Sequence, residues 1–195
     1  PGPPYPVSTL GKVDNPGRRY PFATEIITTG IREATITGKP YPVKGWFAYA
    51  TNLMQALPNE EETIKAIQNL DLLVVVDVIG SELAGWADVI LPEATYLERY
   101  DELNVELFRQ SFVALRQPVV EAPNDQKPNW WIARELAMKL GLEAYYPWND
   151  IEEYLNRRLT AAGLSFDTLK QTGIALGKPA PLYFEDGAEA VFPTP

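Results

Sequence analysis

The chain has 195 residues, of which 46% are hydrophobic, and this is enough for a globular domain with its own core. A formal net charge of −9 argues against nucleic acid and anionic membranes as partners, because both are bound through Lys and Arg. Cysteine and histidine are absent, which excludes disulfides, cysteine-bound iron–sulfur clusters and a Ser-His-Asp triad within this sequence.

The first third of the sequence predicts an extended start, then a helix and a strand. Residues 1–21 form a proline-rich loop, and residues 31–36 predict a short helix. The aromatic segment 43–49 predicts a strand, and residues 51–57 form the loop that leaves it.

A second helix is predicted after Pro58. Asn59 is a suitable N-cap residue, and Glu62 stands three residues later, as in a capping box. Apolar residues then recur at helical spacing at Ile64, Ile67 and Leu70.

Two short hydrophobic runs follow this helix. The first run, residues 72–76, is followed by Asp77, and the second, residues 89–91, is followed by Pro92. Between the two runs, residues 82–86 predict a one-turn helix. Such runs are typical of parallel strands buried on both faces, and strand–helix–strand order predicts a right-handed βαβ unit. Ligands of parallel sheets bind beyond the carboxyl ends of the strands, so Asp77 stands where a nucleotide hydroxyl or base edge is read.

The second half of the sequence predicts mostly helices. Residues 95–120 alternate loosely and predict a ribbon or an irregular crossing. Three helices are predicted after it, the first of them ended by Gly141, and one strand is predicted in the tail; their ranges are 130–140, 151–159, 166–171 and 181–184.

These elements predict an α/β fold, a Rossmann-like three-layer domain with a mainly parallel sheet, flanking helices and extended proline-rich ends. We expect an extended N-terminal segment at 1–40, a Rossmann-like region at 41–141 and a helical extension with a tail at 142–195. The proline-rich ends and the missing initial methionine predict a fragment of a longer protein.

Several motifs occur together in this order. They are the VVVD of residues 74–77, the SELAGWADVILP of 81–92, the A-T-x-x-E of 94–98, the PVVE of 118–121 and the PNW of 128–130. Together they resemble the molybdopterin-dinucleotide oxidoreductases, the family of dimethyl sulfoxide reductase and formate dehydrogenase. Within it, the chain is most similar to the branch of polysulfide and thiosulfate reductases.

The resemblance implies a cofactor that carries molybdenum or tungsten between two molybdopterin guanine dinucleotides, one of which this chain helps to hold. The intact enzyme would reduce or oxidise a sulfur compound or a similar small inorganic substrate, whereas the fragment alone would be inactive. The resemblance further implies that residues 41–141 are a cofactor-binding region and that the extension at 142–195 leads to a C-terminal domain. An iron–sulfur cluster is expected outside this segment. The resemblance also implies an iron–sulfur electron-transfer subunit, a membrane anchor subunit and a location outside the cytoplasmic membrane.

Four residues are candidate cofactor ligands, each with a structural alternative. Asp77 accepts hydrogen bonds from guanine or ribose, or caps the next turn. Asn52 suits a phosphate oxygen or a base edge, or forms a turn. Ser81 binds phosphate with nearby N–H groups, or caps the following short helix. Asn129 contacts guanine in addition to starting a helix.

Other positions are assigned structural roles or depart from the family pattern. Asp88 is expected to cap the following strand or to fix the turn through backbone N–H groups. Ala50 stands where the family has Gly, Leu53 replaces a Pro, and Ala56 replaces a hydroxyl residue. These departures weaken the functional interpretation of Asn52. Two alternatives to the whole assignment are a stand-alone guanine-nucleotide-binding module and an interaction module, both without redox activity.

Overall fold

The computed structural model describes residues 12–15, 19–22, 27–106 and 109–179. The chain divides into two compact units. The first comprises residues 1–93 and 125–127, and the second comprises residues 94–124 and 128–195.

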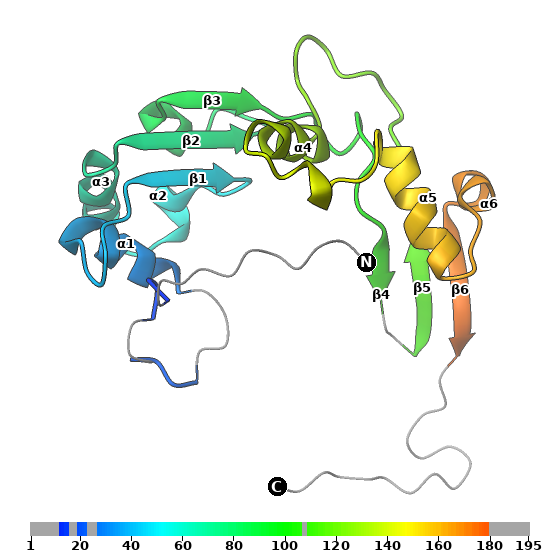
Figure 1. Cartoon of the computed structure of the whole chain (residues 1–195), viewed down its shortest axis with the longest axis horizontal. Helices are drawn as coiled ribbons and strands as arrows, with labels where there is room; N and C mark the ends of the chain where they lie inside the picture. The colour runs from blue at the N-terminus through cyan, green and yellow to red at the C-terminus, as the bar shows by residue number, and fades with distance from the viewer. Residues whose placement is uncertain (1–11, 16–18, 23–26, 107–108, 180–195) are drawn as a thin grey trace, which may run out of the picture. The chain divides into compact units, whose positions relative to one another are not determined.

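The first unit is built on a parallel sheet with the strand order β1-β2-β3 (Figure 1). Phe47 of β1 pairs with Val74 of β2, which pairs with Val89 of β3. The predicted strands are confirmed, and β2 has the predicted bounds. The elements of this unit are α1 (Thr28–Thr37), β1 (Gly45–Tyr49), α2 (Leu53–Ala56), α3 (Glu60–Gln68), β2 (Leu72–Asp77), the 3-10 helix η2 (Leu83–Trp86) and β3 (Val89–Pro92).

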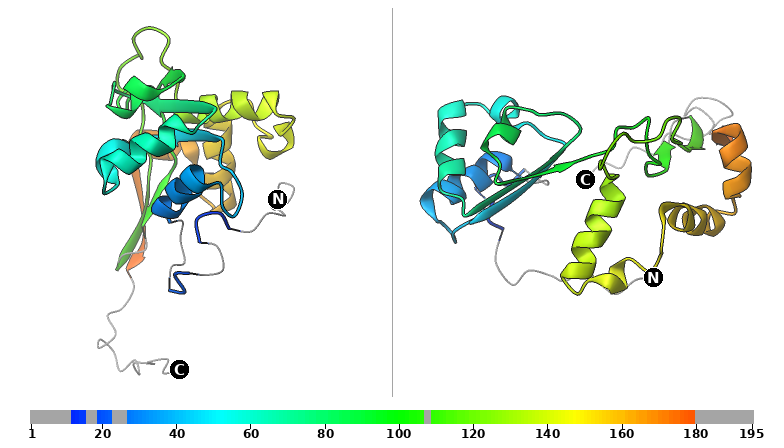
Figure 2. Two further views of the ribbon diagram at one scale, coloured as in Figure 1. Left: turned by 90° about the vertical axis from the view of Figure 1, so that its left-hand side faces the viewer. Right: turned by 90° about the horizontal axis from the view of Figure 1, so that it is seen from above.

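The core of the first unit lies on one face of this sheet. Ala48, Leu73 and Val75 point to the same face, because Ala48 pairs with Val75 and strand side chains alternate. Residues of α2, α3 and η2 pack against them, and the right-hand view of Figure 2 shows these helices on one side of the sheet. All the connections between the three strands therefore cover the same face.

The opposite face keeps apolar side chains in contact with solvent. Phe47 is 50% exposed, Leu72 46% and Val89 42%. The prediction of strands buried on both faces is correct for Val75 and Val76 of β2, and it is wrong for β3, where Ile90 is 53% exposed. The reason is position: β3 is the last strand of the sheet and has a strand neighbour on one side only.

Helix α1 is longer than predicted, and a buried arginine joins it to the start of α3. Arg32 is 8% exposed, and its Nη1 donates to the carbonyl oxygens of Pro58 at 2.6 Å and Asn59 at 3.2 Å. It also donates to Thr63 Oγ1 at 3.2 Å. Gly30 in the same helix allows close approach, because a Cβ there would lie 1.9 Å from the carbonyl oxygen of Asp14.

The predicted capping box at Asn59 is wrong. Helix α3 does begin directly after Asn59, yet the Asn59 side chain makes no capping hydrogen bond. Its φ of 63° places it in the left-handed region, whereas a capping side chain usually belongs to a residue with extended backbone. Instead, Glu62 Oε2 lies 4.0 Å from Arg32 Nη2.

The second unit combines an antiparallel sheet of order β4-β5-β6 with helices. The pairing of β4 with β5 confirms the predicted ribbon. Its core consists of the buried residues Leu103, Leu115, Ile151, Leu155, Leu159, Phe166 and Leu169. The elements are β4 (Asn104–Glu106), β5 (Gln110–Ala114), α4 (Asn129–Lys139), the 3-10 helix η3 (Glu143–Tyr145), α5 (Ile151–Ala161), α6 (Phe166–Thr172) and β6 (Ile174–Pro179).

The three helices predicted here are confirmed to within two residues at each end. Asp150 caps α5 by accepting from Glu153 N at 2.8 Å, and Ser165 caps α6 by accepting from Thr168 N at 3.3 Å. Gly141 has a φ of 70°, as expected of the glycine that follows a helix. Strand β6 was not predicted, since it contains Gly177 and Pro179, and the strand predicted at 181–184 lies outside the described residues.

Candidate functional site

The carboxyl ends of β1, β2 and β3 meet at one edge of the parallel sheet, where a ligand of this kind of sheet binds. The segment 50–52 leaves β1 there, and the segment 77–81 includes the end of β2 and the turn after it. Glu93 follows β3 and donates its backbone N–H to the carbonyl oxygen of Asp77 at 3.0 Å. The edge therefore gathers polar residues that are far apart in the sequence.

Asp77 is the last residue of β2 and is partly buried. Its Oδ1 accepts from the backbone N–H of Val78 at 2.7 Å. Within the described residues, Oδ2 has no hydrogen-bond partner. One oxygen thus fixes the turn, and the other is open to a ligand.

Asn52 lies directly before α2 and makes no side-chain cap of that helix. Its Nδ2 donates to Glu82 Oε2, and Gln55 Nε2 donates to Glu82 Oε1 at 2.7 Å. Asn52 Oδ1 is buried and has no hydrogen-bond partner within the described part of the chain. The loops after β1 and β2 are therefore joined by one carboxylate between two amides.

Ser81 stands in the loop after β2. Its Oγ is buried and has no partner among the described residues, and it does not cap η2, whose N-cap residue is Glu82. A buried polar atom without a hydrogen bond costs about 1–3 kcal/mol unless a ligand or water satisfies it. Asn52 Oδ1 and Ser81 Oγ are thus two such atoms at the same edge.

Asn129 belongs to the second unit, where it is the first residue of α4. Its Oδ1 accepts from the backbone N–H of Trp130 at 2.8 Å. The structure thus brings Asn52, Asp77 and Ser81 together at one edge of the first unit, and it places Asn129 at a helix start in the second.

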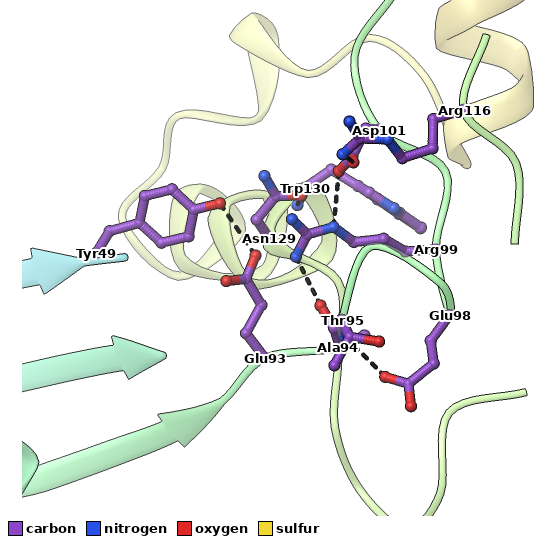
Figure 3. A network of polar contacts seen from close by, with 10 residues as sticks. All are labelled: Tyr49, Glu93, Ala94, Thr95, Glu98, Arg99, Asp101, Arg116, Asn129 and Trp130. Carbon is purple, nitrogen blue, oxygen red and sulfur yellow. Dashed lines mark hydrogen bonds and ion pairs between the residues drawn. The ribbon is translucent and has the colours of Figure 1, made fainter. Parts of the chain in front are cut away.

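Glu93 is a buried acid at the sheet edge that the sequence reading missed. It is 2% exposed, and Tyr49 at the end of β1 donates its hydroxyl to Glu93 Oε1 at 3.0 Å (Figure 3). The sequence does carry a signal for it, because Glu93 comes after the run 89–91 and Pro92, much as Asp77 comes after the run 72–76. Glu82 and Gln55 carry no such signal, since their contact joins two separate loops.

Ala50 has a left-handed backbone, with a φ of 50°. Its N–H donates to the carbonyl oxygen of Val76 at 3.0 Å, which holds the chain in this conformation as it leaves β1. A side chain with Cβ is strained in this region, and this explains physically why glycine suits the position.

Two motif acids have structural roles. Asp88 Oδ2 accepts from the backbone N–H of Leu73 at 2.7 Å, so it uses a backbone N–H group as expected, but this group belongs to the neighbouring strand β2 and not to a turn. In the second unit, Glu98 Oε2 accepts from Thr95 N at 2.7 Å, while Glu98 N donates to Thr95 O at 3.0 Å (Figure 3). The A-T-x-x-E motif is therefore a turn that caps itself.

Charged side chains stabilise the segment after this turn, with Arg99 and Asp101 partly buried and Arg116 exposed. Arg99 Nε donates to Asp101 Oδ1 at 2.7 Å, and its Nη1 donates to the carbonyl oxygen of Ala94, also at 2.7 Å. Arg116 Nη1 reaches Asp101 Oδ2 at 2.6 Å. In the described ranges, no three acidic side chains are grouped so as to hold a metal, and no helix has the length and apolar character needed to cross a membrane.

Comparisons with known proteins identify relatives of the chain. The model of a family described as molybdopterin oxidoreductase matches residues 20–139. The thiosulfate reductase molybdopterin-containing subunit PhsA of Salmonella typhimurium is 38% identical over 149 residues, which cover 75% of this chain and 20% of that protein. Acetylene hydratase of Syntrophotalea acetylenica is 35% identical over 164 residues, covering 84% of this chain and 22% of that one.

A solved structure agrees with these matches. Acetylene hydratase from Pelobacter acetylenicus superposes with a TM-score of 0.68 and 33% identity, over 80% of this chain and 21% of the other. The chain therefore spans about a fifth of the length of these relatives.

Proposed function

Because the chain belongs to the molybdopterin oxidoreductase family, we propose that its first unit holds one molybdopterin guanine dinucleotide at the carboxyl edge of the β1–β3 sheet. Asn52, Asp77 and Ser81 are the proposed ligands there. Asn129, which belongs to the second unit, is proposed separately as a contact of guanine. When bound, the cofactor supplies two-electron chemistry at molybdenum or tungsten. This chain's part is to bind and orient one of its dinucleotides.

The observation that carries this proposal is the pair of buried atoms without partners, Asn52 Oδ1 and Ser81 Oγ. They fit a polar ligand at the edge where parallel sheets bind nucleotides. The open oxygen of Asp77 adds an acceptor for ribose hydroxyls or guanine N–H groups. A module that served only for protein contacts would have no use for unsatisfied polar atoms at this edge.

For the intact protein, we propose oxidation or reduction of a sulfur compound or a similar small inorganic substrate. The similarity to thiosulfate reductase supports this choice. The relatives themselves differ in their named activities, which include acetylene hydratase and assimilatory nitrate reductase. An iron–sulfur partner subunit, a membrane anchor subunit and a location outside the cytoplasmic membrane are part of the same proposal, as is a cofactor-binding region over residues 41–141.

Replacement of Asp77 tests the cofactor site. In the intact protein, Asp77→Ala should reduce the guanine nucleotide released from the purified protein by acid hydrolysis to less than half of the wild-type amount, because it removes a charged acceptor. Asp71→Ala is the matched control, since Asp71 precedes the same strand at its opposite end and is exposed. Equal nucleotide content in both variants and the wild type would contradict the assignment of Asp77.

A further inference from the structure

Glu82 is an acid at the sheet edge that is not among the proposed ligands. Its two carboxylate oxygens accept from two different amides, Asn52 Nδ2 and Gln55 Nε2. A carboxylate only accepts hydrogen bonds, so it orients each amide with the nitrogen toward Glu82. The orientation of Asn52 is thus set by chemistry, and its carbonyl oxygen is the end of the amide that remains for a ligand.

The remaining oxygen has the properties of a ligand-binding atom. Asn52 Oδ1 is buried and lacks a partner within the described residues, while Asn52 as a residue is only partly buried. The atom therefore lies just beneath the surface at the end of β1. An acceptor in this state is satisfied only by an N–H or O–H donor.

We propose that Glu82 is a positioning residue that holds Asn52 as a hydrogen-bond acceptor, so that this corner of the edge reads the N–H groups of a 2-amino-4-oxopyrimidine ring and does not bind phosphate. Guanine and pterin share this ring edge, and both occur in the cofactor of the proposed function, on which this inference rests. A phosphate group offers only acceptor oxygens and so cannot satisfy Asn52 Oδ1, while Asn52 and Gln55 each direct an amide N–H to Glu82. Its negative charge would also lie close to that of Glu82.

The ionisation of Glu82 agrees with this role. Its own backbone N–H and then the Asn52 amide hold the pKa of the Glu82 carboxyl below its ordinary value, with a smaller contribution from Gln55. The group therefore stays charged near neutral pH and remains an acceptor for both amides.

The test compares each 2-amino ligand with an analogue that lacks this group, since IDP has hydrogen at that carbon and lumazine has an oxo group. Binding of GDP and IDP to the full chain is measured by titration calorimetry, and pterin is compared with lumazine in the same way. We expect the wild type to prefer the 2-amino member of at least one pair by about tenfold, the effect expected when a buried acceptor loses its donor. The pair that shows the preference tells whether guanine or pterin occupies this corner.

Glu82→Gln should reduce this preference to about twofold or less, because glutamine can donate to Asn52 and allow its amide to turn over. Asn52→Ala should have the same effect, and adding Glu82→Gln to Asn52→Ala should cause no further loss if Glu82 acts through Asn52. Glu61→Gln is the matched control, since it removes an exposed charge from α3. Circular dichroism of each variant verifies that the fold is kept.

The outcomes separate this inference from the proposed function. If the wild type binds the nucleotides without any preference for the 2-amino group, or if Glu82→Gln keeps the full preference, the role of Glu82 is overturned and the cofactor site stands. If the wild type binds none of the four ligands, the proposed function falls together with it.

Discussion

At the scale of single residues, the sheet edge concentrates the unusual features of the chain. Ala50 has a left-handed backbone, Asn52 and Ser81 each bury an unsatisfied oxygen, and Glu93 is a buried acid. Strained backbone and unpaired buried groups both cost stability, and proteins keep them mainly where a ligand binds. Their collection at one edge is a stronger indication of a site than any single residue.

The strain at Ala50 predicts a stabilising substitution. Ala50→Gly should raise the free energy of unfolding by about 0.5–1 kcal/mol, because glycine adopts a φ of 50° without a Cβ clash. Urea denaturation measures this change. Ala48→Gly, two residues earlier in extended β1, is the control and should lower the same free energy. A destabilised Ala50→Gly variant would show that the backbone there is not under strain.

Glu153 predicts a pH-dependent contribution to stability. The backbone N–H of Asn149 and then Arg157 hold the pKa of its carboxyl below the ordinary 4.5. A lowered pKa in the folded state stabilises the fold above about pH 4.5, and this stabilisation is lost as the pH falls through the folded-state pKa.

Glu153→Gln should therefore be less stable than the wild type at pH 7, and the difference should shrink at pH 3, as measured by urea denaturation at both pH values. Glu121→Gln, in an exposed loop, should change little at either pH. A difference that persists unchanged at pH 3 would assign the effect to packing.

At the scale of elements, the parallel strands were predictable and the pairing of β6 was not. The runs 72–76 and 89–91 are recognisable in the sequence because each is a short apolar segment followed by a polar residue or a proline. Strand β6 has no such pattern, since it forms by adding to β5 far away in the sequence. Its structure depends on long-range pairing, which the local propensity of these residues does not predict.

The candidate site divides in the same way. Asp77, Asn52 and Ser81 were predictable because each follows a strand in its own segment. The contact of Glu82 with Asn52 and Gln55 was not, since it joins loops that only the folded sheet brings together. The cap at Asn59 failed for a local reason, as a positive φ turns its side chain away from the helix start.

Helix α1 depends on a close contact at Gly30. Gly30→Ala should lower the free energy of unfolding by about 1–3 kcal/mol, because the new Cβ would meet the backbone oxygen of Asp14, which cannot move as a flexible side chain does. Thermal unfolding measures the loss. Gly80→Ala is the control, since no atom lies within 4 Å of its new Cβ. Equal stability of the two variants would show that α1 shifts freely.

At the scale of the whole molecule, the described chain has two hydrophobic cores, one in each unit. The first is centred on β2, and the second surrounds α5 and α6. No residue belongs to both cores in the described part of the chain.

This separation predicts local responses to core mutations. Leu73→Ala and Leu155→Ala should each cost about 2–5 kcal/mol, since both side chains are almost fully buried. Hydrogen exchange should accelerate in β2 and α3 for the first variant, and in α5 and α6 for the second. Equal acceleration in both units for either variant would show that the chain unfolds as one cooperative block.

The order of the strands also has a consequence for the speed of folding. In the first unit each strand pairs with the next one in the sequence, so that Gly45 meets Leu72 and Val74 meets Val89. In the second unit Phe112 pairs with Leu176, and this pairing closes a much longer loop at a greater entropic cost. Folding rates fall as the sequence separation of contacts grows. The parallel sheet, with its polar edge, should therefore assemble before β6 completes the antiparallel one.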